Sequence, residues 1–447
     1  MTRYPGRLLA FSFTLASLLP PAPAHAQSVR DALNALFVFS GGETPLFLGG
    51  SAGVPATQVH GDHFLPSESQ ANGAVIRFMN ESIATNVANF PLGSTVSSQT
   101  FVFVGGVPTP TSNSFGPIFA ERAPTVGRGR FNAGMSYSRL SFDEIRGTPL
   151  SSVLLTFLHQ NVDFPGCDEV FGGDCTDFGE PLVEHDMIEL ELDLDMQAEI
   201  YAFHASIGLT DWLDLALAVP VIHFRLDGRS EARILPLAGQ PVVHFFGGTP
   251  EDPVLEASSR SSGESTGIGD IATRIKARLT RNEGIDVALL GEVRAPTGSE
   301  EEFLGSGELS ARGLIIASGA FGAFSPHVNA GYIYRGGELD QDAIELAAGF
   351  DHGLAPWATL AVDLLGSFKL GEPPVAFPAP VTLQSPHERE IRLTNIPDRN
   401  DDIVDGAVGF KFRTPAGIVL VANALIPLNE GGLRSGVVPT FGIEYSH

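Results

Sequence analysis

Apolar and polar residues alternate along most of the chain after about residue 128. The stretch MIELELDLDMQAEI, residues 187–200, is the clearest case, because acidic residues and leucines occupy strictly alternate positions from Glu189 to Asp195. Successive side chains of a β-strand point to opposite faces of a sheet, so this stretch predicts a strand with one apolar and one acidic face. Similar runs follow, separated by turns rich in glycine and proline. The pattern predicts an all-β fold from residue 128 onward.

We predict twelve strands in this part of the chain. They lie at about residues 128–145, 187–208, 212–227, 267–281, 285–295, 308–320, 326–336, 342–351, 357–370, 401–413, 417–427 and 435–446. The three long connections, at about 146–186, 228–266 and 371–400, are all odd-numbered in chain order, and every even-numbered connection is short. Outer-membrane barrels have short turns on the periplasmic side and longer loops outside. The sequence therefore predicts a transmembrane antiparallel up-and-down β-barrel of about 12 strands.

A soluble β-sandwich is the alternative to a barrel, because it also alternates apolar and polar residues along its strands. The strand at 187–208 argues against it, since strands of globular proteins usually have about 5–6 residues. In a barrel, Leu190, Leu192 and Leu194 would face lipid, and the residues between them would face the lumen. The predicted lumen-facing residues are Glu189, Glu191, Asp193, Asp195, Glu199, Arg274, Lys276 and Arg278. Acids paired with these bases would form a polar scaffold, whereas acids alone would make a cation-preferring pore.

The first residues have the three parts of a secretory signal peptide. Two arginines precede the apolar run Leu8–Leu19, and residues 24–26 read Ala-His-Ala, a small-residue cleavage site. We expect cleavage before Gln27, which removes residues 1–26 and exports the mature protein to the outer membrane of a Gram-negative bacterium. The apolar run is too short for a transmembrane helix, which needs about 20 residues.

Residues 27–127 lack the alternating pattern and are rich in glycine, proline, serine and asparagine. A short helix is predicted at Gln27–Phe37, and turn residues dominate the rest. We expect this segment to fold into the lumen as a plug, burying its scattered phenylalanines against the inner wall. The alternative is an extension that is disordered or packed on the surface. The barrel itself then comprises residues 128–447.

Composition and motifs exclude several kinds of function. The net charge of −25 at pH 7 argues against nucleic acid as a partner, because phosphate binding requires a basic patch. His60 and His63 have no third metal ligand nearby, and we find no convincing arrangement of a nucleophile with a base. We therefore predict that the protein is not an enzyme and has no cofactor and no metal site.

The first long loop contains the two cysteines of the chain, Cys167 and Cys175. An exported protein folds in an oxidising compartment, so we predict a disulfide that stiffens this loop. Acidic residues in the same loop, and the run DRNDDIVD at 398–405, could bind calcium. Ile403 stands where an EF-hand loop needs glycine, so we interpret these acids as solvated charges that divalent ions can bridge to lipopolysaccharide.

Three stretches resemble a family of bacterial outer-membrane barrels described as transporters or as a meta-pathway phenol-degradation family. They are residues 267–307, beginning GIGD and containing the turn RAPTG, residues 324–334, and residues 427–447, containing PLNEGGLR. The alternating Phe441, Ile443 and Tyr445 also resemble the C-terminal signal that the outer-membrane assembly machinery recognises, although His447 replaces the usual final phenylalanine.

The family is similar in architecture to fatty-acid and aromatic-hydrocarbon channels. The resemblance implies passive uptake of small hydrophobic or aromatic compounds, with outer-membrane lipid and lipopolysaccharide around the barrel. A general or cation-preferring porin for polar solutes, and a structural or adhesive surface barrel, are the alternatives.

Overall fold

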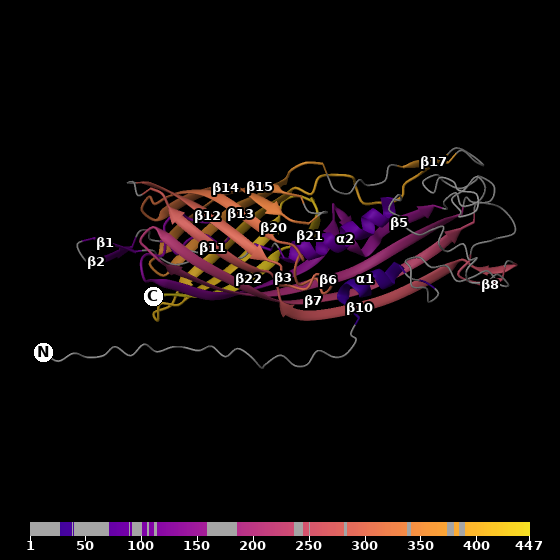
Figure 1. Ribbon diagram of the computed structural model, residues 1–447, viewed down its shortest axis with the longest axis horizontal. Coiled ribbons are helices and arrows are strands. Elements are labelled where there is room, and N and C mark those ends of the chain that lie inside the picture. Colours follow the sequence, from indigo (N-terminus) through magenta and orange to yellow (C-terminus); the bar gives the residue numbers. More distant parts are fainter. Residues whose placement is uncertain are drawn as a thin grey trace.

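The structure is a computed structural model, and its chain forms a closed β-barrel from one end of which a curved sheet projects (Figure 1). The described residues are 27–37, 39, 71–88, 90–91, 101–104, 107–110, 114–158, 186–236, 245–249, 251–280, 284–337, 341–372, 380–383 and 389–447. None of the helices within these ranges has the length and apolar character needed to cross a membrane. The predicted pair Cys167 and Cys175, together with His60 and His63, lies outside the described residues.

Twelve antiparallel strands form the barrel, which confirms the predicted fold class. They are β3 (Phe131–Ile145), β6 (Met187–Gly208), β7 (Leu213–Leu235), β11 (Ile271–Arg278), β12 (Ile285–Ala295), β13 (Ser310–Gly319), β14 (Phe324–Arg335), β15 (Ala343–Ala355), β16 (Ala358–Lys369), β19 (Ile403–Arg413), β20 (Val419–Pro427) and β22 (Val438–Ser446). Each strand pairs with the next in this order, and β22 pairs with β3 to close the ring. All twelve predicted ranges overlap these strands.

Further elements lie before, between and beside the barrel strands. They are α1 (Val29–Asn34), η1 (Ala35–Phe37), α2 (Ala71–Ala88), β1 (Phe101–Val104), β2 (Val107–Pro110), β4 (Thr148–Pro149), η4 (Leu150–Ser152), β5 (Val153–Leu158), β8 (Gly247–Thr249), β9 (Asp252–Val254), β10 (Glu256–Ile268), β17 (Val381–Leu383), β18 (Arg389–Ile391) and β21 (Leu433–Ser435). The helix predicted at 27–37 is present as α1 and η1. The longer α2 was not predicted, because its sequence contains glycine, asparagines and β-branched residues that disfavour helices.

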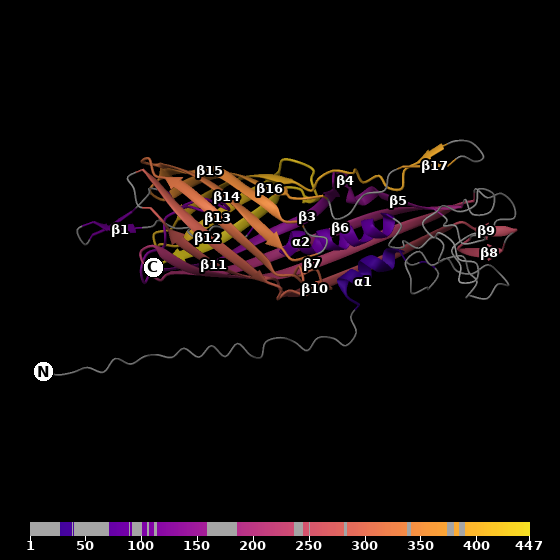
Figure 2. The same ribbon diagram turned by 45° about the horizontal axis from the view of Figure 1, so that its top comes forward.

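Strands β6 and β7 continue past the barrel and form a projecting sheet with β5 and β10 (Figures 1 and 2). We call this four-stranded sheet the extension. β10 pairs with β7 over Val221–Arg233, and β11 pairs with Leu213–Ala218 at the start of the same strand. Much of the long loop predicted at 228–266 is therefore strand. Between β10 and β11 the register slips by one residue at Gly269 and Asp270, as at a β-bulge, so inward-facing positions change from odd to even.

The acids of β6 lie on the outer face of the extension, so their predicted placement in the lumen is wrong. These residues are Glu189, Glu191, Asp193, Asp195 and Glu199. The leucines between them are buried in a core shared with α1, η1 and α2. Leu194, for example, pairs with Gly228, where an added Cβ would lie 2.5 Å from Leu36 of η1. Two of the acids face basic residues of β7, with Asp193 opposite Arg229 and Glu189 opposite Arg233, whereas Glu191 and Asp195 lie opposite acids of that strand.

The reason for this error is a change of surroundings along one strand. From Tyr201 onward the exposed positions of β6 are Tyr201, Phe203, Ala205 and Ile207, which suit contact with lipid. Before Tyr201 the same face carries charge, because it meets water, and the opposite face packs on helices. The alternation is unbroken, but the apolar face of β6 is the inner one before Tyr201 and the outer one from Tyr201 onward.

The outer face of the barrel between the level of Tyr201 and the short turns is apolar, and we call it the apolar belt. It exposes Leu217, Ile275, Leu289, Ile315, Val328, Leu364, Phe410 and Phe441. Trp212, Phe321 and Trp357 are exposed at the end with short turns, and Tyr332 and Tyr334 are exposed towards the other end. An apolar outer band between two sets of aromatic side chains is typical of membrane-spanning barrels.

Candidate functional site

Residues 114–127, which we call the plug segment, cross the lumen near the end with short turns. This stretch has no strand of its own to satisfy its backbone, so inward-facing side chains accept its N–H groups. The N–H of Phe115 donates to Thr359 Oγ1 at 3.0 Å, that of Ala123 to Ser318 Oγ at 3.0 Å, and that of Val126 to Asp214 Oδ2 at 2.8 Å. The plug segment is therefore fastened to strands β16, β13 and β7.

Asp363 of β16 is the main anchor of this segment. Its Oδ2 accepts the N–H groups of Ile118, Phe119 and Ala120 at 3.1, 2.9 and 3.3 Å. Its Oδ1 lies 2.7 Å from Nε2 of His327, and both side chains are buried. Because one carboxylate accepts three consecutive N–H groups, it fixes this part of the plug segment to a single point of the wall.

A second anchor lies beside it. Asp351 of β15 contacts the hydroxyl of Ser114 and lies 3.3 Å from Nη1 of Arg122, which pairs two plug residues with one buried carboxylate. His327 Nδ1 is 3.7 Å from Asp351 Oδ1, so the imidazole stands between the two aspartates. Ion pairs as buried as this one tie the segment down, because removal of either partner would leave a charge without compensation.

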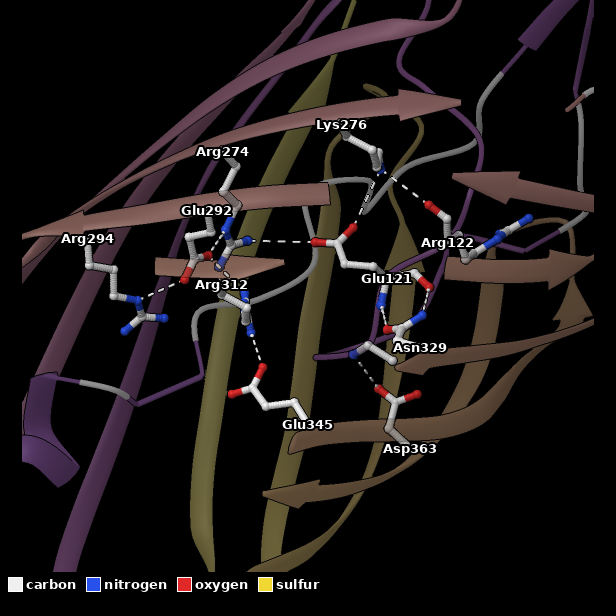
Figure 3. A network of polar contacts seen from close by, with 11 residues as sticks. Glu121, Arg122, Arg274, Lys276, Glu292, Arg294, Arg312, Asn329, Glu345 and Asp363 are labelled. Carbon is white, nitrogen blue, oxygen red and sulfur yellow. Dashed lines mark hydrogen bonds and ion pairs between the residues drawn. The ribbon is translucent and has the colours of Figure 1, made fainter. Parts of the chain in front are cut away.

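On the side of the plug segment that faces the long-loop end, acids and bases form a buried charge cluster (Figure 3). Glu292 of β12 contacts Arg274 and lies 2.9 Å from Arg294 and 2.8 Å from Arg312. Glu121 of the plug segment reaches Arg274 at 3.7 Å, and it reaches Lys276 at 3.5 Å. The cluster thus joins three strands of the wall to the plug.

The structure places Arg274 and Lys276 on the inner face, but their partners are not the acids of β6. Glu292 could have been found from the sequence, because it alternates with apolar residues in β12 just as the basic residues do in β11. Glu121 could not, since the plug segment has no periodic pattern. Arg278 lies at the end of β11, half-buried, and donates to the carbonyl of Asp211 in a short turn at 3.1 Å.

A cavity of about 230 Å³ lies between the plug segment, the end of α2 and the barrel wall. One part of its wall is apolar and includes Leu140, Phe142, Leu314, Ile333 and Leu425. The charged part comprises six basic residues, Arg274, Arg294, Arg312, Arg335, Lys369 and Arg434, and four acidic residues, Glu121, Glu292, Glu345 and Asp405. We call it the central cavity; its wall suits solutes that combine an apolar body with a polar group.

Two smaller cavities adjoin the central cavity along the lumen. An outer one of about 50 Å³ lies between α2 and connections at the long-loop end, and it shares Thr85, Asn86 and Lys369 with the central cavity. An inner one of about 30 Å³ lies nearer the short turns and is lined by residues such as His204, Lys411 and Glu444. The three cavities therefore follow one another from the long-loop end towards the short-turn end.

Helix α2, which bounds the central cavity, is contacted near its middle and at its C-terminal end. Arg146 is fully buried, makes two hydrogen bonds of 2.8 Å to Asp401 and places its guanidinium 4.7 Å from the centre of the Phe78 ring, near the middle of the helix. At the C-terminal end, Arg294 donates to the carbonyl of Ala88 at 2.6 Å, as cations commonly do at helix C-termini.

Helix α1 seals the inner face of the extension. Its N–H at Val29 donates to Glu302 at 3.4 Å, and Arg30 pairs with Glu300 at 2.6 Å. β10 presents small inward residues to it, and a Cβ added at Gly263 would lie 3.1 Å from the Cα of Val29. The serine- and glycine-rich sequence of β10 thus reflects a close approach of helix to strand.

The described residues contain no group of three or more histidine, cysteine or acidic side chains placed to hold a metal ion. No protein-family model matches the sequence. No curated protein matches it either.

Solved structures of several outer-membrane barrels are similar in shape. The COG4313 outer membrane channel from Pseudomonas putida F1 is 12% identical, with 73% of this chain and 98% of that chain covered and a TM-score of 0.41. A mutant of the TodX monoaromatic hydrocarbon channel is 9% identical, with coverages of 73% and 91% and a TM-score of 0.31. A FadL homologue from Pseudomonas aeruginosa is 12% identical, with coverages of 71% and 89% and a TM-score of 0.29. The architecture of this chain is established by its own strand register, which closes a ring of twelve strands.

Proposed function

We propose that this protein is an outer-membrane channel for the passive uptake of small hydrophobic or aromatic compounds. The observation that carries the proposal is the central cavity, which combines a wall of leucine and phenylalanine with fixed charges and lies in series with two other cavities. Such a cavity can receive a small apolar molecule from outside and pass it along the lumen without a cofactor or an energy source.

In this proposal residues 27–127 form the plug and residues 1–26 are a signal peptide that is removed. The apolar belt contacts membrane lipid, and the charged outer face of the extension stands at the level of lipopolysaccharide. The last strand, β22, is the part that the assembly machinery recognises. The disulfide between Cys167 and Cys175 stays a prediction.

The alternative of a cation-preferring porin loses its original basis, because the acids of β6 do not line the lumen. A porin for polar solutes remains the second candidate, since the charge cluster occupies part of the central cavity wall. The two functions differ in the solutes that they would admit.

The uptake of a labelled monoaromatic compound by cells with and without the gene tests the proposal. At limiting external concentration we expect faster accumulation when the gene is present, and an unchanged rate for a sugar of similar mass. Equal accumulation of the aromatic compound in both strains would refute the proposed function, and faster entry of the sugar alone would favour the porin.

A further inference from the structure

The central and inner cavities meet at a single pair of phenylalanines. Among the described residues, only Phe90, Pro91 and Phe119 line both cavities. The rings of Phe90 and Phe119 lie edge to face, with centroids 6.4 Å apart and planes at 84°. A solute that moves from the central cavity to the inner cavity along this route must therefore pass these two rings.

Hydrogen bonds fix the backbone on both sides of Phe119 and on the N-terminal side of Phe90. Phe119 donates its N–H to Asp363, and the N–H of Glu121 donates to Asn329 at 2.7 Å. Phe90 follows the end of α2, where Ala88 is held by Arg294, and it precedes Pro91. Because neither backbone can shift without breaking these bonds, rotation of the side chains is the smallest movement that can join the cavities. Such rotations are fast compared with movements of whole segments.

We propose that Phe90 and Phe119 form the gate of the channel, and that the gate favours planar aromatic solutes. This inference rests on the proposed function for its substrate class. A planar ring can stack on Phe119 when Phe90 turns away, so that one aromatic contact replaces another. A saturated ring of similar size is thicker and offers no such contact, and it must displace both phenylalanines.

The first experiment measures whether the pair is the constriction. The purified full-length protein is inserted into planar bilayers, and the ionic current is recorded in potassium chloride. We expect the double variant Phe90→Ala with Phe119→Ala to conduct several-fold more current than the unmodified protein. The matched control is Phe224→Ala, which shortens a buried phenylalanine of β7 that lines neither the central nor the inner cavity, and we expect little change there.

Correct folding is verified by the shift in electrophoretic mobility on heating that closed barrels show. If the double variant does not fold, the proposal is tested by the second experiment, which uses Phe119→Leu, a substitution that keeps most of the side-chain volume. A folded double variant that conducts no more than the unmodified protein would overturn the gate, and so would an equal increase in the Phe224→Ala control.

The second experiment measures the preference for aromatic rings. Benzoate and cyclohexanecarboxylate have the same charge and similar size, so their relative permeability, taken from reversal potentials, reports the ring alone. We expect the unmodified channel to prefer benzoate, Phe119→Leu to lose the preference and Phe119→Tyr to keep it. Equal permeability in the unmodified channel, or a preference unchanged by Phe119→Leu, would refute the aromatic selectivity.

These outcomes are separable from the failure of the proposed function. If cells accumulate aromatic compounds equally with and without the gene, the uptake role is wrong. The gate as a constriction would still be supported by an increased current in the double variant. Conversely, uptake that depends on the gene, together with unchanged current in the double variant, would support the uptake role and refute the gate.

Discussion

Asp363 is the residue at which one substitution should release the plug segment. In Asp363→Ala the three N–H groups of residues 118–120 lose their acceptor inside the barrel. A buried donor without a partner costs about 1–3 kcal/mol, so the attachment weakens by about 3–9 kcal/mol. Water from the adjoining cavities can satisfy part of this loss, and we take about 3 kcal/mol as the expected value. Since about 1.4 kcal/mol changes an equilibrium constant tenfold, the state in which the plug segment is detached from the wall should become roughly a hundredfold more populated.

Single-channel recording measures this population as the fraction of time spent in a high-conductance state. We expect Asp363→Ala to open far more often than the unmodified channel, and Asp363→Asn, which keeps one acceptor oxygen, to show an intermediate effect. Asp193→Ala is the control, because Asp193 lies on the outer face of the extension and touches no part of the plug. A folded Asp363→Ala channel that opens no more often than this control would refute the anchoring role of Asp363.

Three further predictions concern the two faces of the wall and the charge of the lumen. In a protein lacking Cys167 and Cys175, a membrane-impermeant maleimide should label Asp193→Cys but not Leu192→Cys on intact cells, and the reverse result would restore the lumen placement of the acids. Gly263→Leu forces a side chain against α1, so it should destabilise the extension by about 1–3 kcal/mol; a thermal unfolding midpoint equal to that of the unmodified protein would contradict the close approach. Because six basic and four acidic residues line the central cavity, a potassium chloride gradient should give a reversal potential of the sign for anion preference, and the opposite sign would favour the cation-preferring porin.

The barrel strands could be predicted from the sequence because their signal is local. Each strand carries its own alternation, and the lengths of the connections reveal their up-and-down order. The orientation of residues 187–199 could not be predicted in the same way. Alternation shows that Leu192 and Asp193 face opposite sides, but which side is apolar depends on what lies beyond the wall. That information resides in α1 and α2, far away in the chain.

The extension was missed, and the contacts of the predicted plug could not be assigned, for a related reason. β10 has mostly charged and polar residues on the face that meets water and small residues on the face that must leave room for a helix, so it has no apolar stripe to detect. The plug segment has no periodicity, because side chains of the wall satisfy its backbone in place of a ladder. Arg274 and Lys276 were placed correctly on the inner face by the parity of one strand, but their partners belong to elements that the pattern does not connect.

The position of α2 and the plug segment restricts the order in which the protein can be assembled. A helix with its side chains is about 10–12 Å wide, and the end of α2 and the plug segment bond to inward-facing residues of a wall whose ring is closed between β22 and β3. A finished ring of hydrogen-bonded strands would have to break to admit them. The N-terminal segment must therefore already lie within the curved sheet when its two edges meet, although the chain emerges N-terminus first and its closing strand comes last. The final pairing of β22 with β3 is thus the step that makes the enclosure of the N-terminal segment permanent.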